Sequence, residues 1–265
     1  MSSIRQTPHA RNQPNLATPQ AEERKRVALP QSRHLPVVSI EEGYELWAAT
    51  YDRDLNPLLA LEERTLDPLL PPMQAKNVLD LACGTGRWLG RLLGSGARHA
   101  IGIDLSPAML ARASTKNPLR GRLVRGNCLS LPIRAELADI VICSLAVGHI
   151  PDLRDLAQEV ARVTKPESDL YLTDVHPEAY AKGWRSGFRH EMGSREIATF
   201  AHSKDDVLQT FRGRGFEISL CLEPHFAEPE RPLFERAGKI ALFDEFCQLP
   251  ALLICHFARG RQPRI

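Results

Sequence analysis

The stretch from Lys76 to Gly90, KNVLDLACGTGRWLG, constrains the fold of this chain more than any other. Residues 78–82 form a short apolar run, which is typical of a strand buried on both faces of a parallel sheet. Small residues at 83–86 end that run at once, and leucines at 89, 92 and 93 follow at the spacing of one helix face. We therefore expect a strand, a glycine loop and a helix, with a loop backbone that a ligand can approach closely.

Two acidic residues accompany this loop. Asp80 lies inside the expected strand, and Asp104 follows Gly86 by eighteen residues, near the end of the next apolar run, 99–105. An acid there can accept hydrogen bonds from both hydroxyl groups of a nucleoside ribose. The Gly-x-Gly turn alone is a weak signal, because nicotinamide and flavin enzymes use the same geometry for a pyrophosphate. Loop and acid together predict a nucleoside site.

At this point the chain resembles the class I S-adenosylmethionine-dependent methyltransferases, through V-L-D-L-A-C-G-T-G at 78–86 and G-I-D-L-S-P-A-M-L at 102–110. The resemblance implies S-adenosylmethionine as cofactor and S-adenosylhomocysteine as product. It places contacts to that cofactor at Asp80, Ala82, Cys83, Gly84, Thr85, Gly86, Asp104, Leu105 and Met109.

The rest of the chain alternates strand and helix, the pattern of an α/β fold with a doubly wound sheet. We expect a mostly parallel, seven-stranded, Rossmann-like sheet whose final strand is antiparallel, as in the family. Further strands are expected at 121–126, 138–145, 169–175, 216–222 and 250–258, and helices at 107–116, 152–164, 203–215 and 230–247.

Two further strand ends bear on the cofactor. The segment R-G-N-C-L-S-L-P looks like the family's Gly-Asp-x-x-x-Leu-Pro, with Asn127 in place of the aspartate that accepts from the adenine amino group and Cys128 contributing its N–H. Asn127 could instead simply hold a turn. The fourth strand ends in Ser144 and Leu145, where enzymes that methylate nucleobases carry an Asp/Asn-Pro-Pro-aromatic tetrapeptide. A nucleic-acid substrate is therefore disfavoured.

The N-terminal region divides into a tail and a helical cap. Residues 1–37 are rich in proline and polar residues and are expected to be a disordered tail, followed by a methyltransferase domain over 38–265. Cap helices are expected over 39–70, beginning at Ser39 in a capping box. The segment W-A-A-T-Y-D resembles the N-terminal helix of the quinone- and biotin-pathway branch, which implies cofactor contacts by Tyr44 and Tyr51. The alternative is an aromatic stripe packed on the core.

The segment 176–202 is too long and polar for an ordinary connection and shows no clean periodicity, so we expect an irregular substrate-binding insertion. Aromatic residues there could wall a pocket for a planar acceptor, and basic residues could meet an anionic group. The alternative is a solvated excursion. The candidate substrate residues are Trp184, Arg185, Phe188, Arg189 and His190.

Two histidines are candidate general bases. His149 follows the fourth strand and His176 directly follows the fifth, and these strands should be sheet neighbours. An imidazole suits removal of a proton from a hydroxyl acceptor at neutral pH. The alternative for each is a structural role in its turn.

Composition sets the remaining limits. The 265 residues are 43% hydrophobic and 25% charged, with a net charge of +2, which favours a cytoplasmic protein without a nucleic-acid or membrane partner. The six cysteines show no C-x-x-C spacing, so we expect reduced thiols and no metal. A monomer or homodimer is expected.

The sequence thus predicts a methyltransferase that acts on a small-molecule or carrier-bound acceptor, with O-methylation favoured over N- or C-methylation. Two alternatives stay open: a non-catalytic S-adenosylmethionine-binding module and a nicotinamide-dependent oxidoreductase.

Overall fold

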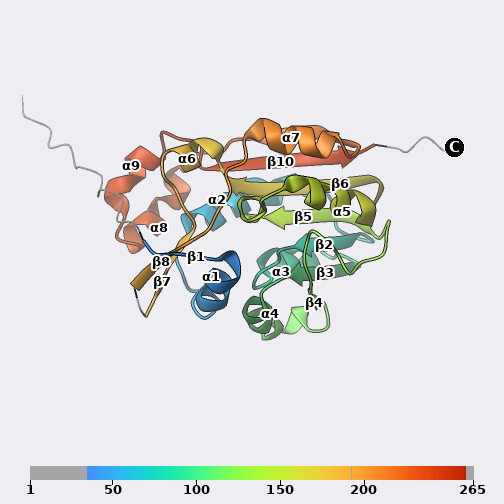
Figure 1. Ribbon diagram of the computed structural model, residues 1–265, viewed down its shortest axis with the longest axis horizontal. Helices are drawn as coiled ribbons and strands as arrows, with labels where there is room; N and C mark the ends of the chain where they lie inside the picture. Colours follow the sequence, from blue (N-terminus) through green and yellow to red (C-terminus); the bar gives the residue numbers. More distant parts are fainter. Residues whose placement is uncertain (1–34, 192, 261–265) are drawn as a thin grey trace, which may run out of the picture. The chain divides into compact units, whose positions relative to one another are not determined.

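The computed structural model describes residues 35–191 and 193–260. A seven-stranded sheet has the order β4-β3-β2-β5-β6-β10-β9 (Figure 1). The tail predicted to be disordered lies outside the described residues up to His34. In chain order the strands of the sheet are β2 (Asn77–Leu81), β3 (His99–Asp104), β4 (Leu123–Arg125), β5 (Ala138–Ser144), β6 (Thr164–Val175), β9 (Phe216–Leu222) and β10 (Leu252–Arg259).

Strand direction follows the predicted pattern. The pairs β2 with β3, β2 with β5, β3 with β4 and β5 with β6 are parallel, whereas β10 is antiparallel to both of its neighbours, β6 and β9. The seven-stranded, mostly parallel sheet and its antiparallel final strand are confirmed, as is the expectation that the fourth and fifth of the predicted strands are neighbours. Strand order reverses between β2 and β5, so the switch point of the sheet lies at their carboxyl ends.

Each face of the sheet is covered by helices. Alternate residues of one strand serve opposite faces: Leu79 packs with α5 (Leu153–Val163) and α7 (Lys204–Arg212), whereas Val78 packs with α2 (Pro57–Leu66) and α3 (Arg87–Gly94). Further helices are α4 (Pro107–Ser114), α8 (Arg231–Arg236) and α9 (Phe243–Phe246), with 3-10 turns η1 (Asp67–Leu69), η2 (Asn117–Leu119), η3 (Val147–His149), η4 (Glu228–Glu230) and η5 (Ile240–Leu242).

The single helix predicted over 230–247 is wrong. The chain there forms α8, η5 and α9, because Gly238 has a positive φ of 66° that ends the first helix and turns the backbone.

The helices predicted within 39–70 are present, and side chains cap the N-termini of both. Ser39 accepts a hydrogen bond from the Glu42 N–H at 3.1 Å and begins α1 (Ile40–Trp47), and Asn56 accepts from the Leu58 N–H to begin α2.

The segment 176–202 is not irregular, which corrects the sequence-based expectation. It contains α6 (Pro177–Ala181) and a hairpin of β7 (Gly187–His190) and β8 (Gly193–Ile197). The hairpin joins β1 (Val37–Val38) in a three-stranded sheet beside α1 (Figure 1). Strands this short carry too little alternation to be read from sequence, and their partner β1 is more than a hundred residues away. Trp47 of α1 stacks on Phe188 of β7, with ring centroids 5.4 Å apart.

No helix in the described part of the chain is long and apolar enough to cross a membrane.

Candidate cofactor and active site

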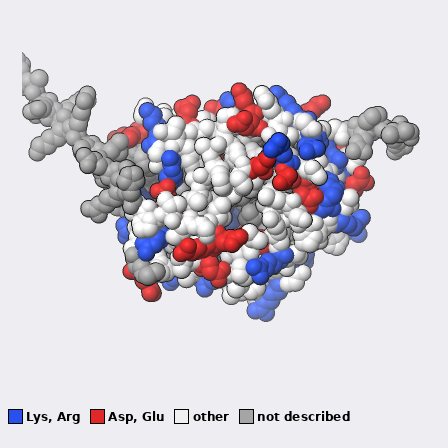
Figure 2. Space-filling model, viewed as in Figure 1, with Lys and Arg blue, Asp and Glu red and all other residues white. Residues whose placement is uncertain are grey.

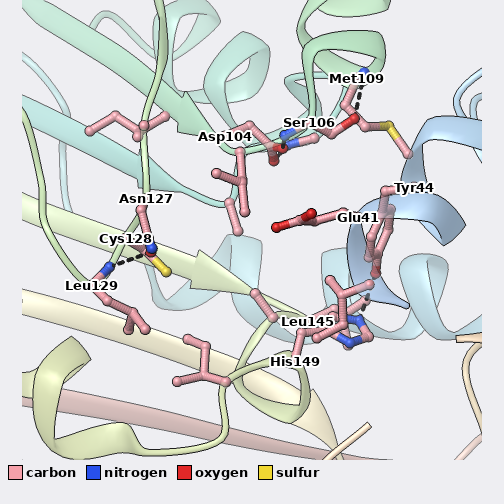
Figure 3. A pocket seen from close by; sticks show the side chains of 18 of the residues that line it. Glu41, Tyr44, Asp104, Ser106, Met109, Asn127, Cys128, Leu129, Leu145 and His149 are labelled. Atoms are coloured by element: carbon pink, nitrogen blue, oxygen red, sulfur yellow. Dashed lines mark hydrogen bonds between the residues drawn. The ribbon is translucent and has the colours of Figure 1, made fainter. Parts of the chain in front are cut away.

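A cavity of about 240 Å³ opens at the carboxyl ends of the central strands, where the strand order reverses (Figure 3). Open α/β sheets bind their ligands at this place. Twelve of the predicted site residues line it: Tyr44, Tyr51, Ala82, Gly84, Asp104, Leu105, Met109, Asn127, Cys128, Ser144, Leu145 and His149.

The glycine loop contains residues with different tasks. Gly84 has a φ of 53° and lines the cavity, and a Cβ at this position would meet no atom within 4 Å. Gly86 has a φ of 77°, but a Cβ there would lie 2.4 Å from Leu119 Cδ1. Gly84 therefore leaves space that a ligand can use, whereas Gly86 is required for packing against η2.

Asp104 is held in place by backbone groups at the end of β3. Its Oδ2 accepts from the Gly84 N–H at 2.7 Å, and its Oδ1 accepts from the Ser106 N–H at 2.8 Å. Burial raises the pKa of Asp104, and the two N–H donors oppose that rise. Each carboxylate oxygen keeps a second lone pair, so the group can still accept hydrogen bonds from a ligand.

Four residues predicted to contact the cofactor do not line the cavity, and three of them have a structural role that the side chain explains. The Asp80 carboxylate accepts from the Leu89 N–H at 2.8 Å and caps α3, because Gly86 at its N-cap has no side chain to do so. Thr85 donates to Asp52 at 2.6 Å, and Cys83 is buried beside Gly102. Gly86 is the fourth. Their direct contact with a cofactor stays a prediction.

On the side expected to receive adenine, the Asn127 Oδ1 accepts from the Leu129 N–H at 2.9 Å (Figure 3). This bond holds a turn, as in the alternative interpretation, and Asn127 still lines the cavity. Leu105, directly after β3, and the buried Met109 of α4 add apolar surface to the cavity.

On the other side, Tyr44 and His149 form a hydrogen bond of 2.7 Å between the phenol and Nε2 (Figure 3). The His149 Nδ1 lies 3.4 Å from the Ala198 carbonyl, which can only accept, so Nδ1 carries the proton. Nε2 is then the basic nitrogen, and the Tyr44 hydroxyl donates to it. Burial lowers the pKa of His149, which favours the neutral ring.

Both tyrosines of the cavity are half-buried. Burial raises the pKa of Tyr51 to about 12 and that of Tyr44 well above its usual value. Both phenols are therefore protonated at neutral pH, and the Tyr44 hydroxyl donates to His149.

His176 lies elsewhere. It is 4% exposed, its Nδ1 accepts from the Glu178 N–H at 3.2 Å to cap α6, and its Nε2 faces Glu223 Oε2 at 3.2 Å. It does not line the cavity. This is the structural role considered as its alternative, and the geometry gives a catalytic role no support.

The predicted substrate residues also lie outside the cavity lining. Trp184 packs against Phe246, with centroids 4.4 Å apart, and Arg185 lies 3.6 Å from Glu196. Phe188 is buried against Trp47 between α1 and the β1-β7-β8 sheet. Arg189 and His190 lie on β7 and do not line the cavity either.

Sequence reasoning missed part of the acceptor side. Glu41 projects its carboxylate into the cavity from α1 (Figure 3), and Ile40, Ile150 and Pro151 line it as well. Glu41 lies three residues before Tyr44, so the spacing of one helix face was an available signal. Ile150 and Pro151 gave no such sequence signal, because they lie in a loop without a periodic pattern. Within residues 35–191 and 193–260, no group of His, Cys, Asp and Glu is arranged to hold a metal ion.

Comparison with known proteins agrees with this geometry. Residues 78–167 match the family model described as "Methyltransferase domain". An uncharacterized methyltransferase of Emericella nidulans is 31% identical over 170 residues, which cover 56% of this chain and 59% of that protein. A demethylmenaquinone methyltransferase of Shouchella clausii is 35% identical over 106 residues, covering 37% of this chain and 45% of that protein. The chain thus spans about half the length of these curated relatives.

Among solved structures, a putative S-adenosylmethionine-dependent methyltransferase from Listeria monocytogenes superimposes with a TM-score of 0.62 at 22% identity. The match covers 77% of this chain and all of that one. Residues 78–167 are therefore similar to a methyltransferase domain, and the chain shares the fold of this solved methyltransferase.

Proposed function

We propose that this protein transfers a methyl group from S-adenosylmethionine to a hydroxyl group of a small-molecule acceptor. The observation that carries the proposal is one cavity with two different ends. Gly84 and the anchored Asp104 lie at one end, and the Tyr44–His149 pair lies at the other.

The cavity residues fit such a cofactor. Gly84 leaves its Cβ position open, Asp104 offers acceptors for ribose hydroxyls, and Leu105 and Met109 offer apolar surface for an adenine ring. Ser144 and Leu145, at the end of β5, border the space next to the glycine loop, where the methionine portion would lie.

When bound, S-adenosylmethionine supplies an electrophilic methyl group on a sulfonium. The protein then has to orient the acceptor, exclude water and receive the acceptor proton. His149 Nε2 is the proton acceptor, because it carries no hydrogen in the neutral ring and faces the cavity. The Tyr44 hydroxyl occupies the position next to Nε2 and either gives way to the acceptor hydroxyl or relays its proton.

The charge of the lining favours an uncharged or cationic acceptor. Glu41 and Asp104 line the cavity, and among the described residues no Lys or Arg does. An anionic acceptor would therefore meet like charge and no counter-ion from the protein's side chains. Acidic side chains also gather over α1, whereas elsewhere on this face both signs are interspersed (Figure 2). The apolar residues Ile40, Ile150 and Pro151 suit an aromatic or aliphatic body for the acceptor.

Calorimetric titration tests the proposal at its first step. The protein should bind S-adenosylmethionine and S-adenosylhomocysteine and should not bind NAD. Radiolabelled S-adenosylmethionine incubated with fractionated metabolites should then give a methylated product. Binding without turnover on any fraction would favour a non-catalytic module, and binding of NAD alone would overturn the proposal.

A further inference from the structure

A fully buried carboxylate lies behind the cavity wall. Glu62 of α2 is 0% exposed, and both of its oxygens accept hydrogen bonds from side chains. Oε1 accepts from the hydroxyl groups of Ser144, at 2.7 Å, and of Thr173. Oε2 accepts from the Trp88 indole N–H at 3.2 Å and from Arg87, which forms an ion pair with it. A buried carboxylate with four donors is fully compensated, so its geometry is fixed.

These donors come from the ends of elements that border the cavity. Ser144 ends β5 and lines the cavity, and Thr173 lies on the neighbouring strand β6. Arg87 is the first residue of α3, directly after Gly86 of the glycine loop, and it also donates to Ser144 at 3.1 Å. Glu62 therefore connects the glycine loop with the end of β5, which face each other across the expected position of the methionine portion.

The connection continues to a strained residue. Leu145 lines the cavity with a φ of 52°, a left-handed conformation that a leucine adopts only when its surroundings enforce it. Its N–H donates both to the Thr173 carbonyl, at 2.9 Å, and to the Thr173 hydroxyl oxygen, at 3.1 Å. That hydroxyl in turn donates to Glu62. The orientation of the Leu145 peptide is thus fixed from Glu62 through Thr173.

We propose that Glu62 is a positioning residue for the cofactor: through Thr173 and Arg87 it holds Leu145 and the glycine loop in the conformation that binds the methionine portion. This inference rests on the proposed function, because it assumes that the cavity takes S-adenosylmethionine. Glu62 itself does not line the cavity and acts only through the residues that it holds.

Two opposite substitutions of Thr173 separate positioning from packing. Thr173→Val keeps the shape of the side chain and removes the hydroxyl group, whereas Thr173→Ser keeps the hydroxyl and removes a methyl group. We expect Thr173→Val to raise the Kd for S-adenosylhomocysteine at least about five- to tenfold, because the hydroxyl both donates to Glu62 and accepts from the Leu145 N–H. Thr173→Ser should bind like the wild type. The opposite result, in which Thr173→Val binds like the wild type and Thr173→Ser binds more weakly, would show that the shape of the side chain matters and would overturn the proposal.

A matched control and a second variant complete the experiment. Thr65→Val makes the same chemical change on α2, where the hydroxyl only donates to the Leu61 carbonyl, and should leave the Kd unchanged. Replacing the ion pair in Glu62→Met/Arg87→Met removes the buried carboxylate together with its half-buried partner, an exchange that preserves the fold in many proteins. We expect a folded protein whose melting temperature is lowered, because Ser144, Thr173 and Trp88 lose their acceptor, and a Kd raised at least about tenfold. Normal binding by the folded double variant would reduce Glu62 to a structural role and contradict the proposal.

The outcome also distinguishes this proposal from the proposed function. If the wild type binds no S-adenosylhomocysteine, the proposed function fails and the positioning role fails with it. If the wild type binds and Asp104→Ala does not, but Thr173→Val and the double variant bind normally, only the positioning role is wrong.

Discussion

One side of the cavity is assembled from neighbouring parts of the chain and the other from distant ones. Ala82, Gly84 and Asp104 come from the ends of two consecutive strands that pair along their length. Tyr44 of α1 and His149 of η3 are 105 residues apart and meet through a hydrogen bond and an edge-to-face ring contact. The first side is built on the central strands and on the helices packed against them, whereas the second forms only when α1 is in place.

The difference separates binding from specificity. A site built on the central strands has little freedom to change, because each residue is also fixed by core packing. A side built from a short helix and a small separate sheet can vary without loss of the main core. We therefore expect substitutions on the first side to abolish cofactor binding and those on the second to affect turnover while cofactor affinity is kept.

The largest effect is expected at His149. His149→Ala removes the proton acceptor, so turnover with a hydroxyl acceptor should fall roughly 10²–10⁴-fold while the Kd for S-adenosylmethionine stays the same. In the wild type, turnover should fall as the pH is lowered through the pKa of His149, which burial places below its usual value. His176→Ala is the matched control and should retain full turnover. Equal turnover by both variants at neutral pH would show that His149 does not act as a general base.

The glycines of the loop should respond in different ways. Gly84→Val places a side chain into open cavity space, so S-adenosylhomocysteine binding should weaken at least about tenfold, with a loss of roughly 1–2 kcal/mol in stability from backbone strain. Gly86→Val should clash with Leu119 and lower the free energy of unfolding by roughly 2–4 kcal/mol. Thermal denaturation and calorimetry of both variants test this, and the reverse pattern would exchange the roles of the two glycines.

A smaller effect is expected from Asp174 beneath the second side. Its Oδ2 accepts from the Gly148 N–H in η3, and burial raises its pKa to about 7. The unfolded carboxyl loses its proton near pH 4. Folded protein therefore holds a proton that unfolded protein has lost, and this stabilisation, fully present below pH 4, disappears as the pH rises to about 7.

Asp174→Asn cannot titrate, so it isolates that contribution. The free energy of unfolding of the wild type relative to Asp174→Asn should fall by at least roughly 1 kcal/mol between pH 4 and pH 7. Chemical denaturation at several pH values measures this difference. A difference that does not change with pH would show that Asp174 titrates normally.

The side of the cavity built on the central strands could be predicted from sequence better than the side that contains Tyr44 and His149. The sheet, its order reversal and the places of Gly84 and Asp104 follow from a contiguous motif in which strand, loop and helix signals agree. Asp80 was predicted to contact the cofactor because it lies in the motif, but the motif does not reveal whether its carboxylate binds a ligand or caps a helix. Only the structure shows that Gly86, the N-cap residue of α3, has no capping side chain and that the Asp80 carboxylate caps this helix instead.

The second side could not be predicted as well, because its contacts are tertiary. No local pattern indicates that Phe188 packs on Trp47 instead of walling a substrate pocket, or that β7 and β8 pair with β1. Glu62 was missed for the same reason, since a glutamate in a helix is normally exposed and only the assembled core surrounds it with four donors.

The most direct test of the account is the Kd of S-adenosylmethionine for the wild type and for Asp104→Ala, measured by calorimetry. Loss of two charge-assisted hydrogen bonds, each worth roughly 1.5–3 kcal/mol, should weaken binding about a hundredfold or more. Asp205→Ala, which removes an exposed carboxylate from α7, should bind like the wild type. An Asp104→Ala variant that folds and binds S-adenosylmethionine with unchanged affinity would contradict the assignment of this cavity.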